Sequence, residues 1–400
     1  MDTPELRRLI ACELDSLRAV RRDLHAHPEL GYQETRTSAV VCDELTRLGI
    51  SFVSGLAGGT GVIASLPAST PSDANGQRGA IGLRADMDAL PIHEETGLAY
   101  ASTKPGLMHA CGHDGHTTIL LGAARVLSAV HRPRPVTLVF QPAEEGGGGA
   151  ERLCNEGALD GSVLGGPVEK MFGLHAWPDL ELGTVSTRPG PLLASTDEIR
   201  IRIVGEQSHA AYPHYSRDPI VAAAQVVVAL QTVVSRNTSP LDSCVVTIGT
   251  IKGGTANNII PQHVSLSGTI RTLRPEMREH ARRRVREIAE GVALGLGCRA
   301  EVELEAGYPV TYNDPALTER FFEVARRAIG AERVFLTPHP TMGGEDFSYY
   351  AQRVPGVFFC LGMKPADAAR YPTLHQPDFD FNDDALGLGV EMMCRVALEA

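Results

Sequence analysis

One short segment of the chain concentrates side chains that bind metal ions. Residues 108–116 read Met-His-Ala-Cys-Gly-His-Asp-Gly-His, which places four metal-binding side chains within eight positions: His109, Cys111, His113 and His116. A thiolate and an imidazole two residues apart, here Cys111 and His113, can bind one ion. The alternative is a loop whose histidines only cap helices. The density of these side chains favours a metal site.

Two adjacent carboxylates, Glu144 and Glu145, follow an apolar segment that we predict to be a strand over 136–140. Neighbouring side chains on extended backbone point in opposite directions, so one carboxylate can bind a metal while the other faces a reacting water. Taken alone, such a pair before glycines is typical of a solvated turn. Its position at the carboxyl end of a strand favours a site, because open α/β sheets bind their ligands there.

Two further histidines, His175 and His375, occupy similar Leu-His segments. A single histidine after an apolar strand is more often structural, but two of them complete a larger set. That set comprises Cys111, His113, Glu145, His175 and His375. Five such ligands suit two divalent ions that share a bridge. Asp88 is either part of an ordinary turn or a carboxylate that fixes the tautomer of a ligand histidine.

The periodicity of apolar residues predicts the elements that position these side chains. In the first part of the chain we expect helices at 6–25, 37–48 and 117–130, strands at 61–66, 80–84, 136–140 and 170–174, and a loop at 67–79. This alternation indicates an α/β fold around a mostly parallel sheet. After Pro191 the pattern changes to a strand at 198–204, a helix at 219–235, strands at 244–251 and 263–271, a helix at 276–295 and a strand at 300–304. That β-α-β-β-α-β order is typical of a ferredoxin-like α+β domain.

The predicted domain boundary therefore falls twice in the sequence. Residues 1–190 and 306–400 form one α/β domain, which ends with a helix at 384–399, and residues 191–305 form an inserted domain. A chain of 400 residues is long enough for both hydrophobic cores.

Composition narrows the class of partner and the location. The net charge of −11 argues against nucleic acid and anionic membrane as partners. The longest apolar stretch, 220–230, is about half the ~20 residues that span a bilayer, so we expect a core or dimer-packing helix there. The charged N-terminus has no secretory signal pattern, and the eight cysteines form no Cys-x-x-Cys pair. These features predict a cytoplasmic protein without a membrane segment.

The order of the motifs resembles that of the metal-dependent aminoacylase and carboxypeptidase superfamily, of the peptidase family M20 type. It is most similar to the amidohydrolase branch with hippurate hydrolases, N-acetyl-diaminopimelate deacetylases and indoleacetyl-amino acid hydrolases. The matching motifs, in chain order, are HAHPELG from His25, RADMDALP, MHACGHDGH, QPAEE, GLHAWP, TANNIIP, GTIRTL, GGEDF and LHQPDFDFND. They extend over nearly the whole chain, and their joint order is far more specific than any one of them.

The resemblance implies a metal-dependent amidohydrolase that cleaves N-acyl-L-amino acids, of the acetyl, benzoyl or aryl-acyl type, to a carboxylic acid and a free amino acid. It implies that the five ligands named above bind two divalent ions per chain. Zinc or manganese is favoured, with cobalt or nickel as alternatives, because a thiolate suits softer ions and carboxylates and imidazoles suit all four. Glu144 would act as general acid/base on a metal-activated water, and Asp88 would support a ligand.

The resemblance also assigns roles to the inserted domain, which would be a lid and a dimerisation domain. His209 lies in the lid motif and would polarise the substrate carbonyl or its oxyanion, often across a dimer interface. Asn258 and Arg271 match positions that hold the substrate carboxylate. Relatives commonly have a second glycine before the lid histidine, where this chain has Gln207 and Ser208. The expected partners are a small substrate and further copies of the chain, as a homodimer or higher homo-oligomer.

Two other functions remain open from the sequence. A dipeptidase or carboxypeptidase of the same superfamily would use the same metal ligands. A non-catalytic, metal-dependent ligand-binding protein is a more distant alternative, and the presence of Glu144 beside Glu145 argues against it. The chain has neither a Gly-x-Ser-x-Gly nor a His-Glu-x-x-His motif, so serine hydrolases and the common zinc-protease helix lose support.

Overall fold

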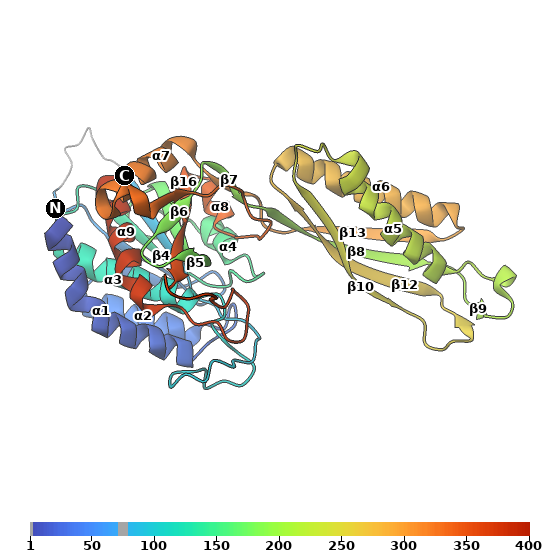
Figure 1. Cartoon of the computed structure of the whole chain (residues 1–400), viewed down its shortest axis with the longest axis horizontal. Helices are drawn as coiled ribbons and strands as arrows, with labels where there is room; N and C mark the ends of the chain where they lie inside the picture. The colour runs from blue at the N-terminus through green and yellow to red at the C-terminus, as the bar shows by residue number, and fades with distance from the viewer. Residues whose placement is uncertain (1–2, 71–78) are drawn as a thin grey trace. The chain divides into compact units, whose positions relative to one another are not determined.

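The computed structural model describes residues 3–70 and 79–400, and these form two compact units (Figure 1). The first unit comprises Met1–Leu192, Tyr312–His339 and Asp346–Ala400, and the second comprises Leu193–Thr311 and Pro340–Glu345. Most of the loop that we predicted at 67–79 falls on residues 71–78, outside the described residues.

The first unit is built on an eight-stranded sheet with the order β1-β2-β4-β3-β5-β16-β6-β15. Its strands are β1 (Ser51–Leu56), β2 (Gly61–Leu66), β3 (Ala80–Asp86), β4 (Val136–Gln141), β5 (Val168–Glu181), β6 (Val185–Thr187), β15 (Val334–Leu336) and β16 (Gly356–Lys364). The neighbouring strands β4, β3, β5 and β16 run parallel to one another. Strands β3 and β4 are buried along their whole length, as expected for parallel strands covered on both faces. The predicted mostly parallel α/β fold is confirmed.

Helices cover this sheet. They are α1 (Thr3–Ala26), α2 (Thr35–Arg47), α3 (His113–Ala129), α4 (Gly149–Asn155), α7 (Pro315–Ile329), α8 (Ser348–Ala351) and α9 (Leu386–Glu399), with short 3₁₀ turns η2 (Ala331–Arg333) and η3 (Asp383–Ala385). Helices α3 and α9 pack on the central strands, and α1 packs on α3 and α9. One continuous apolar core joins α1, α2, α3, α7 and α9 to the sheet.

The start of α3 differs from our prediction in a way that affects the metal ligands. We expected a helix from residue 117, but α3 begins at His113. Gly112 precedes it with φ 84°, a left-handed conformation that costs glycine little. The chain therefore turns into the helix four residues early, and His113 and His116 lie on its first turn instead of in a loop. Strand β5 is also longer than the predicted 170–174, so His175 lies within the strand.

The second unit is a four-stranded antiparallel sheet with the order β10-β12-β8-β13. Its elements are β8 (Ser195–Val204), α5 (Pro219–Asn237), β10 (Cys244–Gly253), β12 (His263–Thr272), α6 (Pro275–Gly295) and β13 (Arg299–Ala306), with a small pair β9 (Ser208–His209) and β11 (Ile259–Ile260) and a turn η1 (Pro213–Tyr215). Helices α5 and α6 pack on this sheet (Figure 1). Strands β7 (Gly190–Leu193) and β14 (Thr311–Asn313) pair with each other where the chain passes between the units. The predicted ferredoxin-like arrangement is confirmed.

Helix α5 is apolar on two faces. Ala222, Val226 and Leu230 are buried in the core of the second unit, whereas Val221 and Val228 are 51% and 65% exposed. Among residues 3–70 and 79–400, it is the helix whose length and composition would allow it to cross a membrane. Helices packed in a protein core share that length and composition, and one face of α5 is packed in this way.

Candidate metal centre

The ligands predicted in the first unit come together at the carboxyl ends of the central strands. Cys111 Sγ lies 3.4 Å from His175 Nε2. The other ring nitrogen of His175, Nδ1, lies 2.8 Å from the carbonyl oxygen of Ala176 and donates to it. That bond fixes the tautomer in which Nε2 has its lone pair free, facing the Cys111 sulfur.

His113 and Glu145 are held by one carboxylate, that of Asp88. His113 Nδ1 lies 3.1 Å from Asp88 Oδ1, and the backbone N–H of Glu145 donates to Asp88 Oδ2 at 2.9 Å. Asp88 is buried. A carboxylate that orients a ligand histidine and also holds the next ligand is the usual support for a metal site.

His375 reaches the same place from the C-terminal part of the chain. Its backbone is left-handed, with φ 64°, and its N–H donates to the carbonyl oxygen of Ala110 at 2.8 Å. Its Nε2 lies 3.3 Å from Glu145 Oε1. The bond to Ala110 ties the His375 segment directly to the segment that carries Cys111 and His113.

The five predicted ligands form overlapping groups in which the ligand atoms lie within 4.8 Å of one another. These groups are Cys111 with His113 and His175, Cys111 with Glu145 and His375, and His113 with Glu144 and Glu145. Cys111 belongs to the first two, which is the arrangement expected of a side chain between two ions. His113 Nε2 is buried and, within residues 3–70 and 79–400, makes no hydrogen bond, whereas the buried Glu145 Oε1 faces His375 Nε2 at 3.3 Å. Because buried polar atoms almost always have partners, this nitrogen and the mixed S, N and O donors fit a metal centre.

The electrostatics of the cluster are those of a site for cations. Burial, with the nearby carboxylates of Glu145 and Glu144, raises the pKa of the Cys111 thiol well above its usual range. Burial opposes the charged form of His113, but the carboxylates of Asp86 and Asp88 raise the pKa of this histidine to about 10. Burial lowers the pKa of His175 well below its usual value. His175 is therefore neutral and ready to act as a ligand, whereas an ion that bound here would have to displace protons from Cys111 and His113.

Glu144 lies next to this cluster and is buried, with 6% of its surface exposed. It follows β4 by three residues, at the carboxyl end of the strand, as predicted. A carboxylate beside a dinuclear site, in a position that excludes bulk water, is placed to exchange protons with a molecule held there.

His116 supports the centre in a way that sequence reasoning did not assign. Its Nδ1 lies 2.7 Å from Asp86 Oδ1, and its Nε2 accepts from the backbone N–H of Ala176 at 2.8 Å. The bond to Ala176 holds the strand next to His175. Residues three apart, such as His113 and His116, lie on one face of a helix, and this spacing could have indicated that they act together. We did not expect it because our prediction placed both residues in a loop.

The second unit brings together two of its three predicted substrate residues. His209 on β9 pairs with Ile259 on β11, and the N–H of Ala210 donates to the carbonyl oxygen of Asn258 at 2.9 Å. His209 Nδ1 accepts from the N–H of Ala211 at 3.0 Å, so its proton is on Nε2, and its side chain is exposed. An exposed Nε2–H is suited to donate to a carbonyl oxygen.

Arg271 lies in the four-stranded sheet, at the end of β8 away from β9. It pairs with Thr196 near the start of β8, whereas β9 follows the far end of β8 at Val204. Eight residues of strand separate these ends, or roughly 26 Å at the usual rise per residue. Burial lowers the pKa of the half-buried Arg271 guanidinium, which donates to Thr269 Oγ1. Within one copy of this unit, Arg271 therefore does not meet His209 and Asn258.

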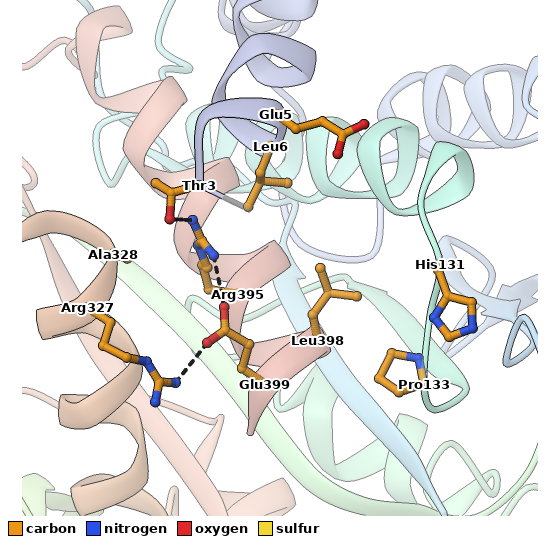
Figure 2. A pocket seen from close by; sticks show the side chains of 10 residues that line it. All are labelled: Thr3, Glu5, Leu6, His131, Pro133, Arg327, Ala328, Arg395, Leu398 and Glu399. Carbon is orange, nitrogen blue, oxygen red and sulfur yellow. Dashed lines mark hydrogen bonds and ion pairs between the residues drawn. The ribbon is translucent and has the colours of Figure 1, made fainter. Parts of the chain in front are cut away.

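A separate pocket of about 770 Å³ lies elsewhere on the first unit and holds none of the predicted ligands (Figure 2). Its charged side chains neutralise one another. Glu399 pairs with both Arg327 and Arg395, and Arg395 also donates to Thr3 (Figure 2). The metal cluster, and not this pocket, is the candidate functional site of the unit.

Comparison with known proteins identifies related sequences over almost the whole chain. An N-acetyl-L-cysteine deacetylase of Bacillus subtilis is 41% identical over 92% of this chain and 84% of its own length. An N-acetyldiaminopimelate deacetylase of Bacillus velezensis is 40% identical over 95% of this chain and 97% of its own. The IAA-amino acid hydrolase ILR1-like 4 of Arabidopsis thaliana is 39% identical over 96% of this chain and 85% of its own.

Solved structures of related proteins have the same fold as this chain. A putative aminohydrolase of methicillin-resistant Staphylococcus aureus superposes with a TM-score of 0.89 at 31% identity, over 99% of both chains. The YXEP protein of Bacillus subtilis, described as a dinuclear metal-binding peptidase of the M20 family, superposes with a TM-score of 0.81 at 33% identity, over 97% of this chain and 98% of its own. The model of peptidase family M20/M25/M40 matches residues 82–399. The resemblance seen in the motifs is thus confirmed, and the chain belongs to peptidase family M20/M25/M40.

Proposed function

We propose that this chain hydrolyses the amide bond of N-acyl-L-amino acids and releases a carboxylic acid and a free amino acid. Its membership of a hydrolase family and its relatives, which are named as N-acetyl amino acid deacetylases and an amino acid conjugate hydrolase, support this activity. The single observation that carries the proposal is the position of Cys111 in two ligand groups next to the buried carboxylate of Glu144.

Two divalent ions are the cofactors. Cys111, His113, Glu145, His175 and His375 would hold them, with Cys111 shared. We propose zinc or manganese, with cobalt or nickel as alternatives, because the set combines one thiolate with three imidazoles and a carboxylate. When bound, such a pair of ions lowers the pKa of water toward about 7 and polarises a carbonyl oxygen.

The protein's own groups then move the protons. Glu144 takes a proton from the attacking water and later gives it to the nitrogen of the leaving amine. His209 Nε2–H donates to the developing oxyanion, where a fixed donor stabilises the transition state most. Arg271 and Asn258 hold the α-carboxylate of the amino acid, because a guanidinium matches a planar carboxylate. Asp88 keeps His113 and Glu145 in place.

A substrate panel on metal-loaded protein separates this function from its main alternative. Acetyl-, benzoyl- and indoleacetyl-amino acids should be hydrolysed faster than dipeptides and tripeptides of the same C-terminal residue. The readout is the released amino acid, followed as kcat/KM. Faster cleavage of the peptides would identify a peptidase instead, and binding of these compounds without any turnover would identify a ligand-binding protein.

We also propose that the active form is a homodimer or a larger homo-oligomer that shares its sites between chains. A substrate the size of an acyl amino acid cannot bridge the roughly 26 Å of strand between Arg271 and the His209–Asn258 pair in one chain. A site that takes His209 and Asn258 from one chain and Arg271 from another removes this conflict.

The second unit has surfaces suited to such an assembly. Strand β10 lies at the edge of its sheet, and most of its residues are exposed. Helix α5 packs against β10, and its exposed apolar residues include Val221 and Val228. Edge strands and apolar patches of this kind pair readily with a second copy.

Hybrid dimers test the sharing directly. A chain with His209→Ala and a chain with Arg271→Ala, carrying different tags and purified as a mixed dimer, should recover about half of wild-type activity, since one of the two equivalent sites is intact. Each variant as a homodimer should be nearly inactive. A mixed dimer that is as inactive as the two homodimers would show that each chain uses its own His209.

We further propose a cytoplasmic location. The eight cysteines are all free thiols, which suits a reducing compartment.

A further inference from the structure

The motif that begins at His25 and the three residues after it have no role in the chemistry above, yet Gly31 and Glu34 lie against the turn that carries Glu144. Glu34 is completely buried. Its Oε1 accepts from the backbone N–H of Ala143 at 2.8 Å, and its Oε2 accepts from the hydroxyl of Thr60 at 2.8 Å. Glu34 thus holds the residue that directly precedes Glu144.

Ala143 needs such a restraint because its backbone is left-handed, with φ 53°. This conformation costs a residue with a side chain roughly 1 kcal/mol or more, so it persists only where the surroundings enforce it. The surroundings here are the segment 31–34. A Cβ added at Gly31 would lie 3.0 Å from the Cβ of Ala143, and the Tyr32 hydroxyl donates to the carbonyl oxygen of Gly147.

Glu144 and Glu145 are positioned by different groups. The amide of Glu145 is held by Asp88, which also holds the ligand His113. The amide before Glu144 is held by Glu34. Loss of the Glu34 contact therefore displaces Glu144 while Asp88 still keeps the metal ligands in place.

We propose that Glu34 is a positioning residue for the general base, which sets the direction of the Glu144 carboxylate through the left-handed backbone of Ala143. This inference rests on the proposed function, since it assumes that Glu144 moves the protons. Its role is that of a hydrogen-bond acceptor and does not require a negative charge.

Glutamine should accordingly be able to replace Glu34 as the hydrogen-bond acceptor. Burial raises the pKa of the Glu34 carboxyl, which favours its neutral form. A glutamine side chain keeps the oxygen that accepts from Ala143, and its amide can donate to the Thr60 hydroxyl. Glu34→Gln keeps the contact, and Glu34→Ala removes it.

The chain offers a matched control in Glu29. This carboxylate lies five residues before Glu34 and is also buried, but it accepts from the amides of Arg36 and Thr37 at the start of α2. Glu29→Ala should therefore destabilise the fold without moving the turn at 142–147. Thermal unfolding of Glu34→Ala and Glu29→Ala measures how much stability each variant loses, so that their activities can be compared on that basis.

The experiment measures kcat, KM and bound metal for Glu34→Ala, Glu34→Gln and Glu29→Ala at saturating metal. Glu34→Ala should lower kcat about 10- to 100-fold with two ions bound and KM little changed, the size typical of a lost supporting contact. Glu34→Gln and Glu29→Ala should stay within about threefold of wild type per folded molecule. In metal-free protein, hydrogen exchange over residues 142–149 should speed up in Glu34→Ala and not in Glu29→Ala.

Several outcomes would overturn the inference. Unchanged kcat in Glu34→Ala would mean that the contact does not position Glu144. An equal loss in Glu34→Gln would assign the effect to charge, and a loss fully explained by missing metal would assign it to the ligands. Glu144→Gln in the same series separates the role of Glu144 from the role of Glu34. If Glu144→Gln stays active, the proposed base is wrong. If it is inactive while Glu34→Ala has normal activity, only the positioning role of Glu34 fails.

Discussion

Glu144→Gln is expected to lower kcat by about 10²- to 10⁴-fold, the range that a general acid/base contributes, while the protein still binds two ions. Glutamine keeps the size of the side chain and one of its acceptor oxygens but cannot take a proton from water. KM should change little, because the substrate is held by other groups. Turnover of an N-acetyl amino acid, with metal content measured on the same sample, checks the expectation.

The neighbouring carboxylate provides the control. Glu145→Gln should lose metal, because Glu145 lies with Cys111 and His375 in one ligand group. Wild-type turnover in Glu144→Gln would refute its role as base. Loss of metal from Glu144→Gln would make it a ligand instead.

Cys111→Ala is expected to bind fewer than two ions per chain and to lose more than the 10- to 100-fold typical of an outer supporting contact. The reason is that Cys111 belongs to two ligand groups, so its removal weakens both metal positions. Metal analysis after dialysis, together with kcat at fixed free metal, measures both effects.

Cys360→Ala is the matched control for that variant. Cys360 is also buried, within β16, but it takes part in none of the ligand groups found among the described residues. It should bind two ions and remain active, with some loss of stability from the cavity. Two ions in Cys111→Ala would contradict the shared-ligand assignment.

Much of the fold could be predicted from the sequence, because hydrophobic periodicity is strong in buried strands and amphipathic helices. The strands at 136–140 and 263–271 and the helix at 276–295 lie within one residue of β4, β12 and α6 at each end. The helix at 117–130 was predicted too short because one glycine, Gly112, decides where α3 begins. Element ends depend on such single backbone conformations, which periodicity does not contain.

The candidate site was predictable as a set of residues but not as a geometry. Cys111, His113, Glu145, His175 and His375 were chosen for their chemistry and for the resemblance, and the structure brings them together. The sequence could not show that Glu34 bonds to Ala143, because the two are far apart in the chain and only the folded backbone joins them. It also could not show that Arg271 lies a full strand away from His209, since register decides that distance.

The most direct measurement for the central claim is the hydrolysis of N-acyl-L-amino acids by metal-free protein as zinc or manganese is added back. We expect no turnover without metal and activity that rises to a plateau at two equivalents per chain, with carboxylic acid and amino acid released in equal amounts. Full activity in the metal-free protein, or no cleavage of any acyl amino acid at two equivalents, would refute the proposed dinuclear amidohydrolase.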